Sequence, residues 1–367
     1  MILLMAIITK HIPMKGRHFQ EFPIWYSTAL IYTIQQKNKF HRKFKRTGDM
    51  SARDKFRQLR NQAQTMVLKC WRHYVEVVEG NLGHHIKEFW RFTKSLKRTN
   101  TYPSDMFLEC SAGDFYSSDS ETVANLFAMN FQNDFSTSSS NPTCQLDTSK
   151  ANSSFSRLAF CEQQIFDVLT HLQLDKGPGD DRISNFFLAM TAPTIAVPLK
   201  LIFNASLAAG SFSCQWKKTI IHPIFKKGDS HNICNYRPIA ILAAMAKVFE
   251  RLVHSALLHH VSPYLNECQH GFLPRKSTVT NLMEYVTFIA ESLDRRHQID
   301  VILVDFSKAF DKISHQLLLA KLQVFGVTGS MLSWFGSYLK ERECAVVFSG
   351  SKSQSFRQSS DAFQINK

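Results

Sequence analysis

Apolar residues recur every three or four positions along much of the chain, and this spacing predicts amphipathic helices. From Leu59 to Val77 they recur at helical spacing and stop at Gly80, and Ser51 with Asp54 three positions on resembles a capping box. We therefore expect a long helix that begins near Ser51. Further helices are predicted over residues 86–96, 161–174, 245–257 and 282–293.

A different pattern, typical of a β-hairpin, covers residues 217–242. The strand TIIHPIF is followed by the polar tip KKGDSHN and by the return strand NYRPIAIL. The short helix at 161–174 runs into KGPGDD, a turn rich in glycine and proline. Helices and strands thus share this half of the chain.

A third pattern is the run VILV at 301–304, which stops on Asp305. We expect a buried strand, followed by a helix that Ser314 caps and that ends at Gly326. A carboxylate at the carboxyl end of a central strand faces the crevice where ligands collect in open α/β sheets. The alternative for Asp305 is an ordinary turn or cap residue.

The composition changes between these regions. Residues 136–154 are rich in Ser, Thr and Asn and contain almost no hydrophobic side chain, which indicates a flexible linker. We therefore expect three parts: a basic helical region at 1–135, the linker at 136–154 and a mixed domain at 155–367.

Charge is concentrated in the first of these parts. Between Lys37 and Arg98 there are 17 basic and 5 acidic residues, so this segment carries most of the net charge of +14. Such density predicts a polyanionic partner, either nucleic acid or an anionic membrane surface, and the alternative is a solvated helix face. The residues that we assign to nucleic-acid contact are Lys43, Lys45, Arg46, Arg57, Arg60, Lys69 and Arg72.

The eight cysteines are spread singly, without a C-x-x-C pair or a Cys/His spacing that suits zinc. Free thiols in a reducing compartment are the simplest interpretation. The opening MILLMAII lacks a basic flank and a cleavage site, so we expect no signal peptide, and no apolar run approaches the ~20 residues of a membrane span. The predicted location is cytoplasmic or nuclear, or both, and not secreted.

The predicted hairpin gathers Lys226, Lys227 and Arg237 near one tip. Arg offers a fixed fork of donors that matches phosphate oxygens, while Lys is a mobile point charge. Together they are suited to a triphosphate. The alternative is that they are exposed charges that serve solubility.

Three segments in this order resemble the reverse transcriptase of jockey-like non-LTR retrotransposons: the hairpin with its following helix, ending in VFERLV, then QHGFLPRKST, then VDFSKAFDKISHQLLLAKL. DKGPGDDRIS precedes them where that family has a Gly-Pro-Asp-Gly turn, and the basic stretches near residues 22–48 and 89–96 are similar to the region before the polymerase. The resemblance covers about residues 12 to 360. It implies an α+β fold, with right-hand polymerase fingers and a partial palm after the basic all-α region.

The resemblance also implies roles for individual residues. Asp305 would be the first metal-binding and catalytic aspartate of a site for two Mg²⁺ ions, with the backbone carbonyl of Phe306 beside it. Phe310 would exclude the 2′-hydroxyl of the incoming nucleotide. Arg237 and the Lys226/Lys227 pair would close on the triphosphate. The implied partners are an RNA template, a DNA primer and deoxynucleoside triphosphates, while Asp311 is expected to be structural.

One part of the family pattern is missing from this sequence. The family continues with a Pro-Gln-Gly segment and an Ala-Asp-Asp hairpin that supplies the other metal ligands, whereas no Asp-Asp pair follows Asp305 here. We therefore expect an RNA-directed DNA polymerase domain that is incomplete in this chain and inactive alone. The alternative is a non-catalytic remnant of a retroelement that binds nucleic acid.

Overall fold

The computed structural model describes residues 22–81, 90, 92–93, 102–103, 105–109, 115–134, 153–305, 313–357 and 364–365. Its internal contacts divide the chain into two compact units, Met1–Thr101 and Tyr102–Lys367. The described part of the first unit is helical, and the second combines helices with a sheet. The predicted α+β class is therefore confirmed. None of the described helices is long and apolar enough to cross a membrane.

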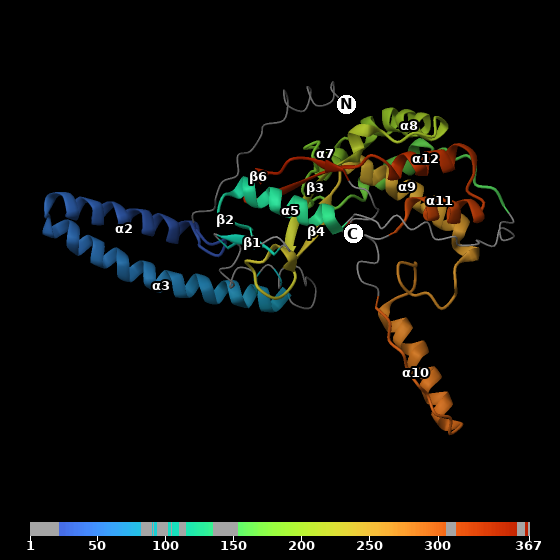
Figure 1. Ribbon diagram of the computed structural model, residues 1–367. Helices are drawn as coiled ribbons and strands as arrows, with labels where there is room; N and C mark the ends of the chain where they lie inside the picture. The colour runs from blue at the N-terminus through green and yellow to red at the C-terminus, as the bar shows by residue number, and fades with distance from the viewer. Residues whose placement is uncertain are drawn as a thin grey trace. The chain divides into compact units, whose positions relative to one another are not determined.

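The first unit contains a hairpin of two long helices, α2 (Thr28–Thr47) and α3 (Met50–Asn81) (Figure 1). Ser27 caps α2 by accepting a hydrogen bond from the backbone N–H of Leu30. Gly48 ends α2 with φ of 69°, a left-handed conformation that costs glycine little, and its N–H bonds to the carbonyl of Phe44. These two caps define the ends of α2. The turn at Gly48 reverses the chain, so that α3 runs back along α2.

The long predicted helix is confirmed as α3, but its predicted cap is wrong. The carboxylate that accepts a bond from the N–H of Ser51 belongs to Asp49, at 2.9 Å, and the helix already begins at Met50. Ser51 therefore lies inside the first turn. The aspartate two residues before it captures the free N–H group, because the turn at Gly48 places Asp49 at the helix start.

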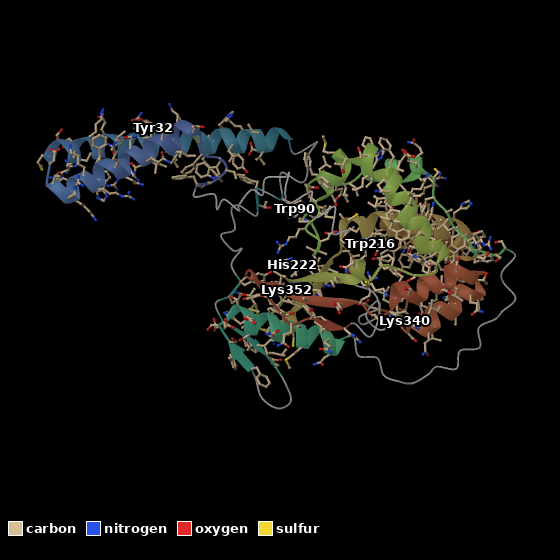
Figure 2. The ribbon with its side chains drawn as sticks, turned by 90° about the horizontal axis from the view of Figure 1, so that it is seen from above. Tyr32, Trp90, Trp216, His222, Lys340 and Lys352 are labelled. Carbon is tan, nitrogen blue, oxygen red and sulfur yellow. The ribbon has the colours of Figure 1, made fainter. Side chains whose placement is uncertain are left out.

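The two helices pack through a narrow apolar seam. Leu30, Ala52 and Ala63 are buried between them. The rings of Trp25 and Trp71 lie 5.1 Å apart at the open end, and aromatic contacts of this kind add to simple area burial. The remaining faces of both helices are exposed, as the outward side chains near Tyr32 illustrate (Figure 2).

The second unit is organised around a sheet with the strand order β6-β5-β3-β4-β8, in which β7 also pairs with β5. Strands β3 (Lys218–Phe225) and β4 (Tyr236–Ile241) form the antiparallel hairpin that the alternation predicts, so this prediction is confirmed. β5 runs parallel to β3 and β8 parallel to β4. The other strands of the sheet are β5 (Glu343–Phe348), β6 (Ser351–Lys352), β7 (Phe356–Arg357) and β8 (Gln364–Ile365).

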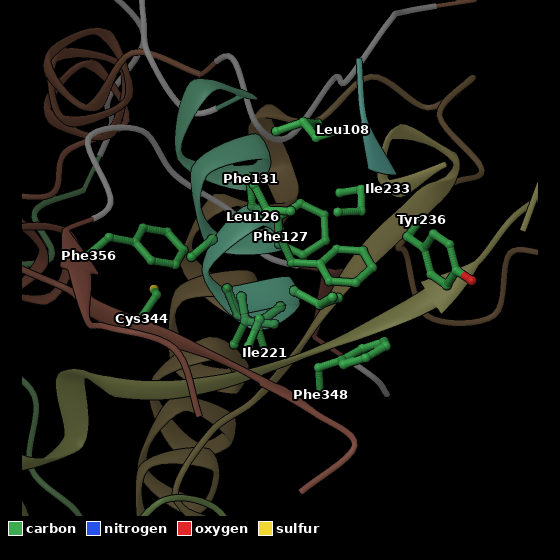
Figure 3. Packing of buried hydrophobic residues seen from close by; sticks show 14 of the residues in the cluster. Leu108, Leu126, Phe127, Phe131, Ile221, Ile233, Tyr236, Cys344, Phe348 and Phe356 are labelled. Carbon is green, nitrogen blue, oxygen red and sulfur yellow. The ribbon is translucent and has the colours of Figure 1, made fainter. Parts of the chain in front are cut away.

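Helix α5 (Ser120–Asp134) covers one face of this sheet (Figure 3). Phe127 lies edge-on to Tyr236 of β4 at 5.1 Å and also contacts Phe348 of β5 at 5.4 Å. The small sheet of β1 (Met106–Leu108) and β2 (Phe115–Ser117) adds Met106 and Leu108 to the same core.

This packing bears on how the chain is divided. Residues 102–134, which the sequence analysis assigns to the basic region, share a core with the sheet. The contact boundary follows residue 101, whereas the predicted linker lies at 136–154, a segment outside the described residues except for its last two. Charge density marks the basic helices in the sequence, but burial against β3, β4 and β5 decides where α5 belongs.

Helices gather into a second hydrophobic core behind the sheet. The predicted helices at 161–174 and 245–257 are confirmed as α6 (Glu162–Thr170) and α9 (Ala244–Val261). The stacked rings of Phe203 and Phe249 and the nearby Trp216 (Figure 2) lie in this core. Its other elements are α7 (Asn185–Met190), α8 (Ala192–Ala208), η1 (Cys214–Lys217) and α12 (Gly329–Leu339), and α11 (His315–Val324) packs against α12.

The turn KGPGDD lies against the end of β4. A Cβ atom on Gly179 would come within 2.7 Å of backbone atoms of Leu242 and Ala243, which is closer than real contacts allow. Only glycine fits this approach without moving the backbone. The turn therefore packs against the end of the hairpin that lies opposite to its tip.

The predicted strand at 301–304 is wrong. These residues form no strand, and their exposed fractions range from 48% at Val301 to 91% at Leu303. The preceding helix is confirmed as α10 (Thr278–Asp294) and the following one as α11, with Gly326 just beyond its end at φ of 83°. Ser314 occupies the N-cap position of α11, but its side chain makes no capping hydrogen bond. An apolar run becomes a buried strand only beside other strands, and the described sheet places none next to it.

Candidate active site

The tip of the β3–β4 hairpin is closed by its own backbone. The backbone N–H of Lys226 donates to the carbonyl of Asn235 at 2.9 Å, and the side-chain amide of Asn235 donates to the carbonyl of Asp229 at 3.0 Å. Gly228 has φ of 92° and lies against the Asn235 side chain, so that a Cβ there would come within 2.8 Å of it. The loop that carries Lys226 and Lys227 is therefore held in one shape.

A second set of contacts fixes the loop to the rest of the unit. The hydroxyl of Tyr236 donates to the carbonyl of Ser230 at 2.7 Å, and burial raises the pKa of Tyr236 to about 12. From β1, the N–H of Phe107 donates to the carbonyl of His231 at 2.8 Å. Neither residue was predicted from the sequence to have a role, because neither is charged and the contact between Phe107 and His231 joins residues far apart in the chain.

The Asp229 carboxylate completes the tip. It accepts a bond from the backbone N–H of His231 at 2.9 Å and approaches the Nδ1 atom of the same residue at 3.1 Å. The backbone bond from His231 is the main reason that the pKa of Asp229 is lowered. This turn is local and exposed, and it adds order to the loop without burying charge.

The three predicted nucleotide-binding cations lie at one end of the hairpin. Arg237 of β4 pairs with Ile224 of β3, and Ile224 precedes Lys226 by two residues. The side chains of Lys226, Lys227 and Arg237 are all exposed. Alternation along the strands places Ile224 and Arg237 on the face away from the α5 core, which Ile221 and Tyr236 line. Among the described residues no carboxylate lies within ion-pair distance of Lys226, Lys227 or Arg237. Their charge is available to an anionic ligand.

Asp305 is exposed and lies outside any strand. Phe306, Phe310 and Asp311 fall outside the described residues. Within the described segments no group of three His, Cys, Asp or Glu side chains could hold a metal ion. The described residues thus offer Asp305 alone, and they do not build a site for two Mg²⁺ ions, which need several oxygen ligands each.

The predicted nucleic-acid contacts are all exposed on the helical hairpin of the first unit. Lys43 and Asp49 form an ion pair at 3.1 Å, and Lys45 and Arg46 lie in the last turn of α2, where they also complement the helix dipole. The other four, Arg57, Arg60, Lys69 and Arg72, lie on α3.

Comparison with known proteins agrees with these features. Residues 224–361 match the family model described as "Reverse transcriptase (RNA-dependent DNA polymerase)". Over 92% of its length the chain is 26% identical to the "RNA-directed DNA polymerase from mobile element jockey" of Drosophila melanogaster, and over 85% it is 25% identical to the "Probable RNA-directed DNA polymerase from transposon BS" of the same organism.

A third relative, the "Probable RNA-directed DNA polymerase from transposon X-element" of Drosophila melanogaster, is 30% identical over 50% of the chain. The chain spans 38%, 35% and 21% of the lengths of these three relatives. The family match includes the end of β3, the hairpin tip, β4 and every element from α9 to β7. Residues 224–361 therefore match the reverse transcriptase family, and most of the chain is similar to the RNA-directed DNA polymerases of transposable elements such as jockey.

Proposed function

We propose that this chain takes part in RNA-directed DNA synthesis, with an RNA template, a DNA primer and deoxynucleoside triphosphates as its partners. The observation that supports the proposal most is the gathering of Lys226, Lys227 and Arg237 at one rigid end of the β3–β4 hairpin, inside the region that matches the family model. In this proposal the hairpin belongs to the fingers and residues after α10 to the palm. The protein would work in the cytoplasm, the nucleus or both.

The hairpin would hold the triphosphate of the incoming nucleotide. Arg237 is next to Pro238, whose fixed φ limits the backbone at that point, and its fork can donate two aligned bonds to phosphate oxygens. Lys226 and Lys227 are adjacent on a closed loop and act as point charges. The bonds from Asn235, Tyr236 and β1 would keep these charges in place before the nucleotide arrives.

Asp305 would be one carboxylate ligand of the two Mg²⁺ ions, beside the Phe306 carbonyl, and Phe310 would select against ribonucleotides. When bound, these ions would activate the primer hydroxyl and stabilise the leaving pyrophosphate. The further carboxylates implied by the family resemblance would come from segments that the longer relatives have beyond this match.

Residues 1–367, purified alone, are expected not to extend a DNA primer on an RNA template with Mg²⁺ or Mn²⁺. Two-metal transfer needs both ions fixed roughly 3.5 to 4 Å apart, which a single carboxylate cannot achieve. The measurement is gel-resolved primer extension beside Asp305→Ala and beside a chain that continues with the next segment of the jockey polymerase. Extension that Asp305→Ala abolishes would show that the site is complete in this chain.

In the chain that continues with the next segment of the jockey polymerase, which we call the extended chain, Arg237→Ala is expected to reduce the efficiency of single-nucleotide incorporation about tenfold or more. The reason is that charge-assisted hydrogen bonds contribute roughly 1.5 to 3 kcal/mol. Lys226→Ala and Lys227→Ala are expected to have smaller effects, since each lysine can partly replace the other. Pre-steady-state incorporation gives both the apparent affinity and the rate. Lysine variants that are more impaired than Arg237→Ala would refute this assignment of the triphosphate clamp.

A second candidate function is nucleic-acid binding without catalysis, as in a remnant of a retroelement. It is favoured by the exposed position of Asp305 and by the exposed cations of the α2–α3 hairpin. The extended chain distinguishes the two candidate functions. A non-catalytic remnant would bind RNA but would not gain primer extension when the next segment of the jockey polymerase is supplied.

A further inference from the structure

The outer side of α2 forms a shallow basic concavity. It encloses about 520 Å³ and is lined by residues of α2 and by Phe22, which precedes the helix. Lys39, Arg42 and Arg46 recur at spacings of three and four, so they lie on one face of the helix. Lys39 and Arg42 were not among the predicted nucleic-acid contacts, although their helical spacing with Gln35 and Asn38 could have indicated a shared polar face.

These three charges are not neutralised by neighbouring side chains. In the part of the chain that the structure describes, no carboxylate is within ion-pair distance of Lys39, Arg42 or Arg46. Lys43 also lines the concavity, but its ammonium group is paired with Asp49. Helix α2 contains no acidic residue at all. A concave surface with uncompensated cations attracts an anion more strongly than a flat one does.

The lining also offers groups that suit a nucleobase. Phe22 and Phe40 supply ring faces or edges, and the amides of Gln35 and Asn38 can both donate and accept hydrogen bonds. Aromatic side chains interleaved with cations are typical of surfaces that bind single strands, because every base has a face that stacks. The volume lies within the roughly 300 to 1,000 Å³ of ligand pockets, which admits a nucleotide but not a double helix.

We propose that this concavity, which we call the α2 groove, binds single-stranded RNA by its phosphates and one unpaired base. The inference rests on the proposed function for the choice of RNA. Lys39, Arg42 and Arg46 would contact consecutive phosphates, and Phe22 would stack on the base. An anionic membrane is less well matched, because a flat surface cannot enter a concavity.

The test uses the full chain and measures equilibrium binding by fluorescence anisotropy. The probe is a labelled RNA of about 20 nucleotides and mixed sequence, which is longer than the site size of a typical single-strand binder. It is titrated at several salt concentrations. A DNA strand and an RNA duplex of the same sequence are titrated for comparison. The groove variant is Lys39→Gln/Arg42→Gln/Arg46→Gln, since Gln keeps the helix propensity of Lys and Arg. The matched control, Arg251→Gln/Lys321→Gln/Arg357→Gln, removes three exposed charges from the second unit.

We expect the groove variant to bind single-stranded RNA at least about tenfold more weakly, and the slope of log K against log salt to fall by about 2, since each lost phosphate contact removes ~0.7. The control should change affinity less than about threefold. Phe22→Leu should weaken binding without altering the salt slope, because stacking releases no counterions. Circular dichroism checks that each variant keeps its helices.

Three results would overturn the proposal. Equal weakening in the groove variant and the control would indicate diffuse attraction, and duplex RNA bound as tightly as single-stranded RNA would exclude a role for the unpaired base. If the groove variant no longer bound vesicles that contain phosphatidylserine but still bound RNA as the unchanged chain does, the groove would be assigned to a lipid surface. The DNA strand shows whether the 2′-hydroxyl contributes. No nucleotide is added, so absence of polymerase activity leaves these outcomes unaffected.

Discussion

Arg342→Met is expected to lower the free energy of unfolding by about 3 to 5 kcal/mol at pH 8, because the mostly buried carboxylate of Glu250 loses its ion-pair partner. Arg342 is 6% exposed and directly precedes β5. Its Nη2 atom lies 3.7 Å from Glu250 of α9, and its Nη1 atom donates to the carbonyl of Tyr338 at 3.2 Å. The guanidinium also lies over the Tyr338 ring, 4.5 Å from its centroid.

The loss should depend on pH in a defined direction. Burial raises the pKa of Glu250, and Arg342 is the main group that opposes this shift. Without Arg342 the pKa of the folded carboxyl rises further above the usual glutamate value near 4.5. A folded carboxyl with a raised pKa contributes stability in acid that is lost as pH rises. The deficit of the variant should therefore be largest in alkaline solution and smaller near pH 5.

Urea unfolding followed by tryptophan fluorescence, at pH 5 and pH 8, measures both effects. The control is Glu250→Gln/Arg342→Met, in which no charge is left unpaired. Its new side-chain amide would still accept the bond that the Tyr338 hydroxyl donates to Glu250 at 3.0 Å in the unchanged chain. This double variant should recover at least half of the loss, since a buried pair replaced as a whole costs little. A deficit that is the same at both pH values would mean that Glu250 is not the group left unpaired.

Phe249→Ala is expected to destabilise the second unit by a similar amount, about 3 to 5 kcal/mol, because it removes a large buried ring and leaves a cavity. Phe249 is fully buried in α9 and stacks on Phe203 at 4.3 Å with an interplanar angle of 4°. Trp334 lies edge-on at 5.2 Å. These rings come from α8, α9 and α12, so the change loosens three elements together.

Phe249→Leu is the matched control, since it keeps most of the apolar volume and should cost less than half as much. α9 follows β4 almost directly, so Phe249→Ala should also expose the hairpin to limited proteolysis sooner than in the unchanged chain. A variant that unfolds at the same urea concentration as the unchanged chain would show that the aromatic cluster is not a stabilising core.

The sequence predicted those features whose signals are local. Alternation with a polar tip was sufficient for the β3–β4 hairpin, and helical spacing with a terminal glycine was sufficient for α11. The motif around Asp305 indicated the family, which the comparisons support. Backbone propensity and turn chemistry act within a few residues, so they can be read without knowing the partners.

What only the tertiary structure decided is which surface each element meets. The register that places Arg237 opposite Ile224, the packing of α5 on the sheet and the pairing of Arg342 with Glu250 all join residues that the sequence alone does not bring together. The run at 301–304 reads as a buried strand but is exposed, because burial depends on neighbouring strands and not on the run itself. The positive charge of the α2 groove likewise depends on which cations have no carboxylate nearby. The fold decides this, and composition alone does not.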